Sequence, residues 1–97
     1  MEGLFDLHIH SIYSGDARDS PENILKFAKS IGLAGVAITD HNRTRGSKKA
    51  VKIAKDYDLI VIPGIEVSTN QGHVLVYGTN EPVPPNIDAN DLMDAHV

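Results

Sequence analysis

The hydrophobic pattern of the chain predicts four strands. Phe5–Ile9 alternates apolar with polar residues, and this period of two indicates a strand with one apolar face. Continuous apolar runs, which are typical of buried strands, follow at residues 36–39, 59–62 and 74–77. Pro63 and Gly64 interrupt the third strand, and residues 65–67 resume it.

Two segments of helical periodicity lie between the first three strands. The first begins at Ser20 and Pro21, which suit a helix cap and a first helical position, and it ends at Gly32. Its predicted inward face consists of Ile24, Phe27, Ala28 and Ile31. The second covers residues 47–55, with lysines facing outward and with Ala50, Val51 and Ala54 facing inward.

The order of these elements favours an α/β fold with a parallel sheet covered by helices. Residues 68–72 are too few for a parallel crossover, which needs about ten residues or more, so we expect a hairpin or a local irregularity there. A proline-rich loop (Pro82, Pro84, Pro85) and a short helix from Asp88 follow.

An open sheet of four strands leaves two exposed edges. We therefore interpret residues 1–97 as one incomplete domain, whose other half comes from further residues or from a second chain.

Composition limits the class of protein and the cellular compartment that we expect for this domain. A hydrophobic share of 41% and a charged share of 23% argue against disorder, and the lack of cysteine excludes disulfides and thiolate ligands. Because the first ten residues leave no room for a signal peptide and no run resembles a membrane span, we expect a cytoplasmic protein. The net charge is −4, yet six of the nine basic residues fall within residues 43–55.

Histidines and carboxylates stand at the carboxyl ends of the predicted strands. His8 and His10 leave the same strand face as Asp6, at a spacing that one metal ion can bridge; the alternative is a pair of solvent-facing histidines. Asp40 and His41 directly follow the second strand, where parallel α/β sheets place their ligand sites. The alternative for these two is a turn or capping aspartate and an exposed loop histidine.

Further candidates are weaker when each is taken alone. Glu66 lies between two apolar neighbours, where a half-buried carboxylate needs a compensating charge such as a metal ion. His73 opens the fourth strand and Asp16 lies in a turn sequence, so both have ordinary structural interpretations. Arg43 and Arg45 are expected in a loop beside the histidines, where they could clamp an anionic group.

Four motifs in order resemble those of the polymerase and histidinol phosphatase (PHP) family. They are Asp-Leu-His-Ile-His-Ser (6–11), Thr-Asp-His-Asn (39–42), Gly-Ile-Glu-Val-Ser (64–68) and Gly-His-Val-Leu-Val-Tyr-Gly (72–78). The resemblance implies the amino-terminal half of a distorted seven-stranded, TIM-like barrel. It also implies a cluster of two or three divalent metal ions, for which histidine and carboxylate ligands suit Zn, Mn or Fe.

The resemblance also assigns individual residues. His8 and His10 would bind one ion, Asp16 and His41 would belong to a second, and Glu66 would bridge ions and share a third with His73. Glu66 and His41 are then the candidate catalytic residues. The family's later ligands, a further histidine and an Asp-x-His pair, are not recognised here. Asp94 and His96 have that spacing, but they fall in the predicted final helix and are interpreted as a coincidence.

The expected function is hydrolysis of a phosphoester, in a phosphorylated small molecule or a nucleotide, by a metal-activated hydroxide. Arg43 or Arg45 would position the substrate phosphate. The alternative is a non-catalytic scaffold or nucleic-acid-associated module, which the basic residues 43–55 favour slightly. An amidohydrolase also begins with His-x-His, but Asp40, His41 and Glu66 fit its later ligands poorly.

Overall fold

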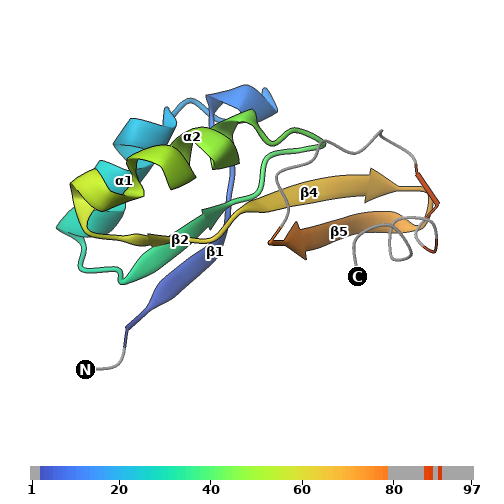
Figure 1. Cartoon of the computed structure of the whole chain (residues 1–97). Helices are drawn as coiled ribbons and strands as arrows, with labels where there is room; N and C mark the ends of the chain where they lie inside the picture. Colours follow the sequence, from blue (N-terminus) through green and yellow to red (C-terminus); the bar gives the residue numbers. More distant parts are fainter. Residues whose placement is uncertain (1–2, 79–86, 89, 91–97) are drawn as a thin grey trace.

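A three-stranded parallel sheet and a β-hairpin form the framework of the described residues, 3–78, 87, 88 and 90, in a computed structural model of the chain (Figure 1). The sheet has the order β1 (Phe5–Ile9), β2 (Gly35–Ile38) and β3 (Ile60–Val61). The hairpin consists of β4 (Gly64–Thr69) and β5 (Gly72–Tyr77). The predicted parallel arrangement of the first three strands and the predicted hairpin are both confirmed.

The helical segments are η1 (Ile12–Ser14), α1 (Pro21–Ser30), α2 (Arg45–Ile53) and η2 (Ala54–Tyr57). The Ser20 hydroxyl accepts a hydrogen bond from the Asn23 amide and caps α1, and Gly32 follows the helix with a φ of 84°. The start of α2 precedes the predicted boundary by two residues. The expectation that Arg45 is a loop residue is therefore wrong, because Arg45 is the first residue of α2.

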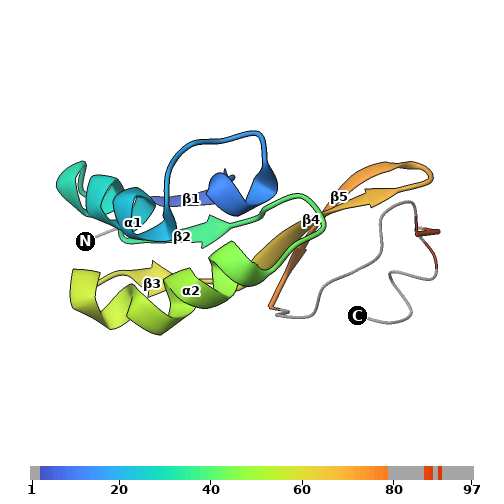
Figure 2. The same ribbon diagram turned by 90° about the horizontal axis from the view of Figure 1, so that it is seen from above.

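Both long helices cover the same face of the three-stranded sheet (Figures 1 and 2). The core between the layers is built from side chains of α1, β2 and α2, with Leu59 after η2: Ile24, Leu25, Ala28, Val36, Ile38, Ala50 and Leu59. Helices on one face only are typical of a barrel wall, whereas an open doubly wound sheet carries helices on both faces.

Some of the predicted inward faces are wrong. Phe27 of α1 is 65% exposed, Ile31 directly after α1 is 56% exposed, and Val51 of α2 is also exposed. In β1, Phe5 and Leu7 are exposed, while Ile9 packs against the core. For β1 and α1 the reason is that β1 pairs only with β2, so no described strand extends the sheet beyond β1 to cover the adjoining face of α1. A groove of about 330 Å³ between β1 and α1 results, lined by Ile9, Phe27 and Ile31 among others.

The hairpin continues the parallel pairing of β2 with β3 in the same register. His41 and Glu66 form a parallel bridge, in which the Asn42 amide donates to the Glu66 carbonyl at 2.8 Å. Asn42 adopts a left-handed conformation (φ 57°), which asparagine tolerates better than most residues. Its side-chain oxygen accepts a hydrogen bond from the Ser68 amide at 2.8 Å, so the turn after β2 holds β4 in register.

A buried carboxylate joins the ends of β1 and β2. Asp40 is fully buried, and its Oδ1 accepts a hydrogen bond from the Ser11 amide at 2.5 Å. The Ser11 hydroxyl, also fully buried, donates to Asp40 Oδ2 at 2.6 Å. Gly46 in the first turn of α2 lies directly against both side chains, and a methyl group added there would collide with them.

Several expectations lie beyond these observations. The proline-rich loop (Pro82, Pro84, Pro85) and most of the predicted final helix, including Asp94 and His96, lie outside the described residues. Among the residues that are described, no helix has both the length and the apolar composition that a membrane span requires. The cytoplasmic location stays a prediction.

We expect Gly46→Ala to lower the free energy of unfolding by about 2–3 kcal/mol. The added methyl group would separate Asp40 from Ser11, and this loss outweighs the gain of roughly 1 kcal/mol in helix propensity. Urea denaturation followed by circular dichroism measures the change. Lys52→Ala on the exposed side of α2 is the control and should change stability by no more than about 0.5 kcal/mol. Equal stability of the Gly46→Ala variant and the unmodified chain would contradict this account.

Candidate metal centre

Six titratable side chains meet at the carboxyl ends of the strands. β1 contributes His8, and His10 directly follows it. Asp16 lies in the loop after η1, and His41 lies in the segment after β2. The two strands of the hairpin, β4 and β5, contribute Glu66 and His73. These are the six ligands that the sequence analysis named. Asp6, on the same predicted strand face, is not a member of the cluster and instead accepts a hydrogen bond from the His8 amide at 3.2 Å.

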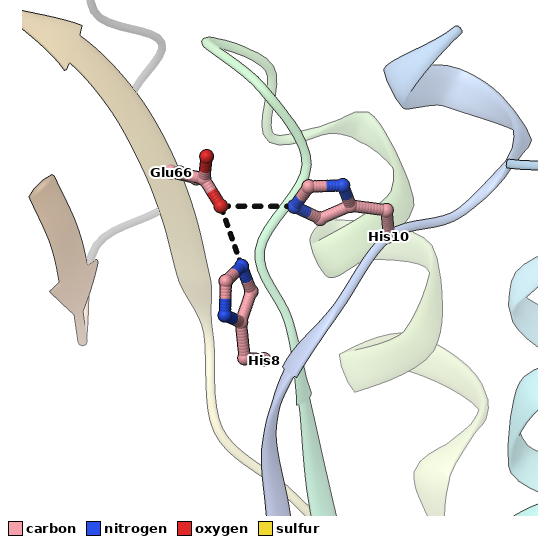
Figure 3. A group of neighbouring side chains, drawn as sticks. All are labelled: His8, His10 and Glu66. Carbon is pink, nitrogen blue, oxygen red and sulfur yellow. Dashed lines mark hydrogen bonds and ion pairs between the residues drawn. The ribbon is translucent and has the colours of Figure 1, made fainter. Parts of the chain in front are cut away.

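Glu66 is the centre of the cluster. Its side chain is 6% exposed, and Oε1 lies 2.5 Å from His8 Nε2 and 3.0 Å from His10 Nε2 (Figure 3). The other oxygen, Oε2, lies 2.7 Å from His73 Nδ1 and 3.2 Å from His41 Nδ1. One carboxylate therefore contacts four imidazoles, two on each oxygen.

Asp16 supplies the second shared carboxylate. Its Oδ2 lies 2.9 Å from His10 Nδ1 and 3.1 Å from His41 Nε2. Gly15, which ends η1 with a φ of 87°, turns the chain so that Asp16 returns toward the sheet. The Ser14 hydroxyl accepts a hydrogen bond from the His41 amide at 2.9 Å and fixes the same loop to the end of β2. A residue of an ordinary turn sequence is thus brought into the cluster by tertiary contacts.

The imidazoles keep the carboxylates charged. Burial raises the pKa of the Glu66 carboxyl, but hydrogen bonds from His10, His8 and His73 outweigh burial and lower that pKa to about 2. Burial raises the pKa of the Asp16 carboxyl too, but hydrogen bonds from His10 and Ser14, together with the nearby charges of His10 and His41, outweigh burial and lower that pKa overall. Burial lowers the pKa of His10, but its bonds to Glu66 and Asp16 raise it overall.

The cluster divides into three groups of possible metal ligands. They are His8, His10 and Glu66; His10, Asp16 and His41; and His41, Glu66 and His73. Within each group the ligand atoms lie within 4.8 Å of one another, close to the span that one ion bonded at roughly 2 Å to each ligand can bridge. Imidazole nitrogen and carboxylate oxygen are donors that suit Zn, Mn and Fe, so the residues present fit a divalent metal cluster.

The two arginines named as phosphate ligands lie beside η1. Arg43 Nη1 donates a hydrogen bond to the Tyr13 carbonyl at 3.0 Å, and the Arg45 guanidinium lies 5.0 Å from the centre of the Tyr13 ring. Both arginine side chains therefore contact η1, the segment that leads into the loop carrying Asp16. Their contact with a substrate stays a prediction.

Four further residues support the cluster, and the sequence did not identify them in this role. Asp40 binds Ser11, and Asn42 binds Ser68, so that the ends of β1, β2 and β4 are held together. Each pair is separated by more than 20 residues, and nothing local in the sequence links its members. The only available signal was that Asp40 and Asn42 flank His41 directly.

Comparison with known proteins agrees with this geometry. The chain matches the PHP domain family over residues 6–87, and it belongs to this family. It is 36% identical over 99 residues to an uncharacterised protein of Methanocaldococcus jannaschii, covering 92% of this chain and 58% of that protein. It is 34% identical over 85 residues to the phosphoribosyl 1,2-cyclic phosphate 1,2-diphosphodiesterase of Eggerthella lenta, covering 81% of this chain and 32% of that enzyme.

Solved structures share the fold. A two-domain protein of Bacteroides vulgatus, which contains a predicted PHP-like metal-dependent phosphoesterase, superposes with a TM-score of 0.82 at 20% identity, covering 97% of this chain and 32% of that one. An amidohydrolase of Chromobacterium violaceum gives a TM-score of 0.71 at 31% identity, covering 82% of this chain and 29% of that one. The chain thus spans only part of the proteins that it matches.

We expect Glu66→Gln to weaken binding of Mn²⁺ or Zn²⁺ by about 100-fold or more. The substitution keeps the shape of the side chain but removes the charge that both oxygens share with the histidines. Isothermal titration calorimetry measures the affinity. Asp6→Asn removes the same charge just outside the three ligand groups and should bind both metals with nearly unchanged affinity. Tight binding by a folded Glu66→Gln variant would exclude Glu66 as a shared ligand.

Proposed function

We propose that this PHP domain hydrolyses phosphoesters with the help of divalent ions held by the six clustered side chains. The observation that supports this most directly is the sharing of two carboxylates, Glu66 and Asp16, among four histidines at the carboxyl ends of the strands. This is the edge at which α/β barrels build active sites. A single metal bound for structural reasons would need no shared carboxylates.

The ring nitrogens limit how many ions these residues hold at once. A neutral imidazole has one lone pair for a metal, and His10 and His41 each belong to two of the three groups. The first and third groups could hold ions at the same time, because Glu66 would offer one oxygen to each group. The middle group competes with both for His10 and His41. We therefore propose two ions on the described residues and a third only where further ligands are added.

Ions bound here supply a hydroxide source at neutral pH and neutralise the phosphoryl oxygens. The protein's part is to hold the charges in place. The low pKa of Glu66 keeps this carboxylate ionised at neutral pH. The carboxylate therefore acts as a hydrogen-bond acceptor that orients the rings of His8 and His41. Its contact with His41, which Asp16 also contacts, is the reason to keep Glu66 and His41 as the candidate catalytic pair. Arg43 and Arg45 are the candidates to hold the substrate phosphate beside the cluster.

The name of one relative supports a proposal for the class of substrate. The Eggerthella lenta relative is named for acting on a cyclic phosphate of a ribose. We propose a phosphorylated small molecule or a nucleotide for this chain, with Zn, Mn or Fe as the metal.

A non-catalytic scaffold or nucleic-acid-associated module remains the second candidate, because six of the nine basic residues lie within 43–55. An amidohydrolase is the third candidate. The Chromobacterium violaceum protein bears that name, so tests of activity should include an amide substrate.

We also propose that residues 1–97 form the amino-terminal half of a distorted (β/α)7 barrel. Both helices cover one face of a parallel sheet whose β1 edge is unpaired among the described residues, as expected for a wall that continues. Further residues or a second chain would cover Phe5, Phe27 and Ile31.

Phosphoesterase activity is tested with bis(p-nitrophenyl) phosphate and p-nitrophenyl phosphate. In a protein that also supplies the other half of the barrel, we expect turnover to disappear with EDTA, to return with Mn²⁺ or Zn²⁺, and to fall by about 100-fold or more in His8→Ala, because this ring would supply one ligand of the first group. His8 is 55% exposed, so circular dichroism should show an unchanged fold. Near-normal rates in a folded His8→Ala variant, or turnover insensitive to EDTA, would refute the proposal.

The half-barrel interpretation predicts low stability for the 97-residue chain alone. Its exposed β1 edge and the exposed apolar residues of α1 favour self-association and leave a small core. Analytical ultracentrifugation and thermal unfolding provide the measurements. A monomer that unfolds cooperatively above about 65 °C, the upper end of the usual range for mesophilic domains, would contradict the interpretation.

A further inference from the structure

A basic groove lies on the exposed side of α2. It has a volume of about 480 Å³ and is lined by Tyr13, Arg45, Lys48, Lys49, Lys52 and Ile53, which we call the α2 groove. None of these residues belongs to the three groups of possible metal ligands. The metal cluster therefore leaves the α2 groove unexplained.

The positive charge of the α2 groove is largely uncompensated. Lys49 pairs with Glu22 at 3.5 Å, whereas Lys48 and Lys52 have no ion-pair partner within the part of the chain that the structure describes. The chain as a whole carries a net charge of −4, so this concentration of cations is local. A solvated helix face would need neither a hollow nor an aromatic wall, and the α2 groove has both.

Tyr13 and Arg45 form the wall of the α2 groove. The guanidinium lies 5.0 Å from the ring centre, which is within the range of a cation–π interaction. Arg43 also contacts Tyr13, because its side chain donates a hydrogen bond to the Tyr13 carbonyl. A planar ring and a planar guanidinium held in this way form a surface on which nucleic-acid bases stack regardless of sequence.

The α2 groove begins beside the metal-ligand cluster and runs away from it. Tyr13 is adjacent to Ser14, which binds the His41 amide, and Arg45 follows His41 by four residues. Figures 1 and 2 both show η1 beside the beginning of α2. From Arg45 the cations advance along the helix at roughly one per turn, about 5.4 Å. This exceeds the rise of about 3.4 Å per nucleotide in a duplex strand, so the spacing suits an extended single strand.

We propose that the α2 groove binds a single-stranded nucleic acid that leads toward the metal-ligand cluster, with phosphates on Lys48 and Lys52 and a base against Tyr13 and Arg45. This proposal rests on the proposed phosphoester hydrolysis only for the cleavage of the bound strand at the metal-ligand cluster. Binding in the α2 groove is a property of these side chains alone and is measurable without metal.

The experiment is fluorescence anisotropy of a labelled 12-nucleotide oligothymidylate with the protein in EDTA, so that a failure of hydrolysis cannot be confused with a failure of binding. For Lys48→Gln combined with Lys52→Gln, we expect affinity to fall by about tenfold or more near 50 mM salt. The slope of log K against log salt should shrink by about 1.4, since each phosphate contact on a single strand contributes roughly 0.7. The matched control, Lys26→Gln with Lys29→Gln, removes the same charge from α1 and should bind nearly as the unmodified protein does.

Two further measurements separate a nucleic-acid site from a general attraction of anions. Tyr13→Leu should weaken binding by about fivefold or more, and Tyr13→Phe should preserve it, because stacking needs the ring and not the hydroxyl. Oligouridylate in place of oligothymidylate shows whether RNA or DNA is preferred, and tight binding of either supports the proposal. Equal losses in the α1 and α2 lysine variants would overturn it. So would an unaffected Tyr13→Leu variant together with equally tight binding of inorganic polyphosphate.

Discussion

The bonds between Asp40 and Ser11 are the constraint on which the rest of the structure depends. A carboxylate without access to water is stable only when its oxygens are satisfied, and here both oxygens accept hydrogen bonds from one residue at the end of a neighbouring strand. The bonds fix the end of β1, which carries His10, relative to the end of β2, which carries His41. Because Gly46 packs on the same pair, the start of α2 is positioned by it as well.

Glu66 shows how the fold tolerates a second buried carboxylate. Its compensation comes from four imidazoles on β1, on β5 and on the turn after β2, so the charge is stabilised only when the sheet and the hairpin are in place. The backbone bridge between His41 and Glu66 brings this about, because it holds β4 against the end of β2. Docking of the hairpin on β2 therefore brings Glu66 and His73 to the other members of the cluster.

Much of this could be predicted from local sequence, and most of the errors concern contacts between segments that are distant in the sequence. Periodicity located the strands and both long helices, the four motifs contain five of the six clustered side chains, and the family resemblance added Asp16. Phe27 and Val51 were wrongly placed in the core because helical spacing shows which residues share a face but not whether a neighbour covers that face. Asp40 and Asn42 were not recognised as supports because their partners, Ser11 and Ser68, are distant in the sequence.

His10, Asp16, His41 and Glu66 form a closed ring of side-chain contacts. Glu66 contacts one nitrogen of each ring, and Asp16 contacts the other nitrogen of each. Two neutral rings have only two N–H groups for these four contacts. A change of tautomer in one ring therefore changes which carboxylate receives its hydrogen bond, and this in turn affects the tautomer that the other ring prefers. A cation that binds one of these nitrogens needs the lone pair there, so the ring's proton must sit on the opposite nitrogen and face the other carboxylate, which makes occupancy of the neighbouring positions interdependent.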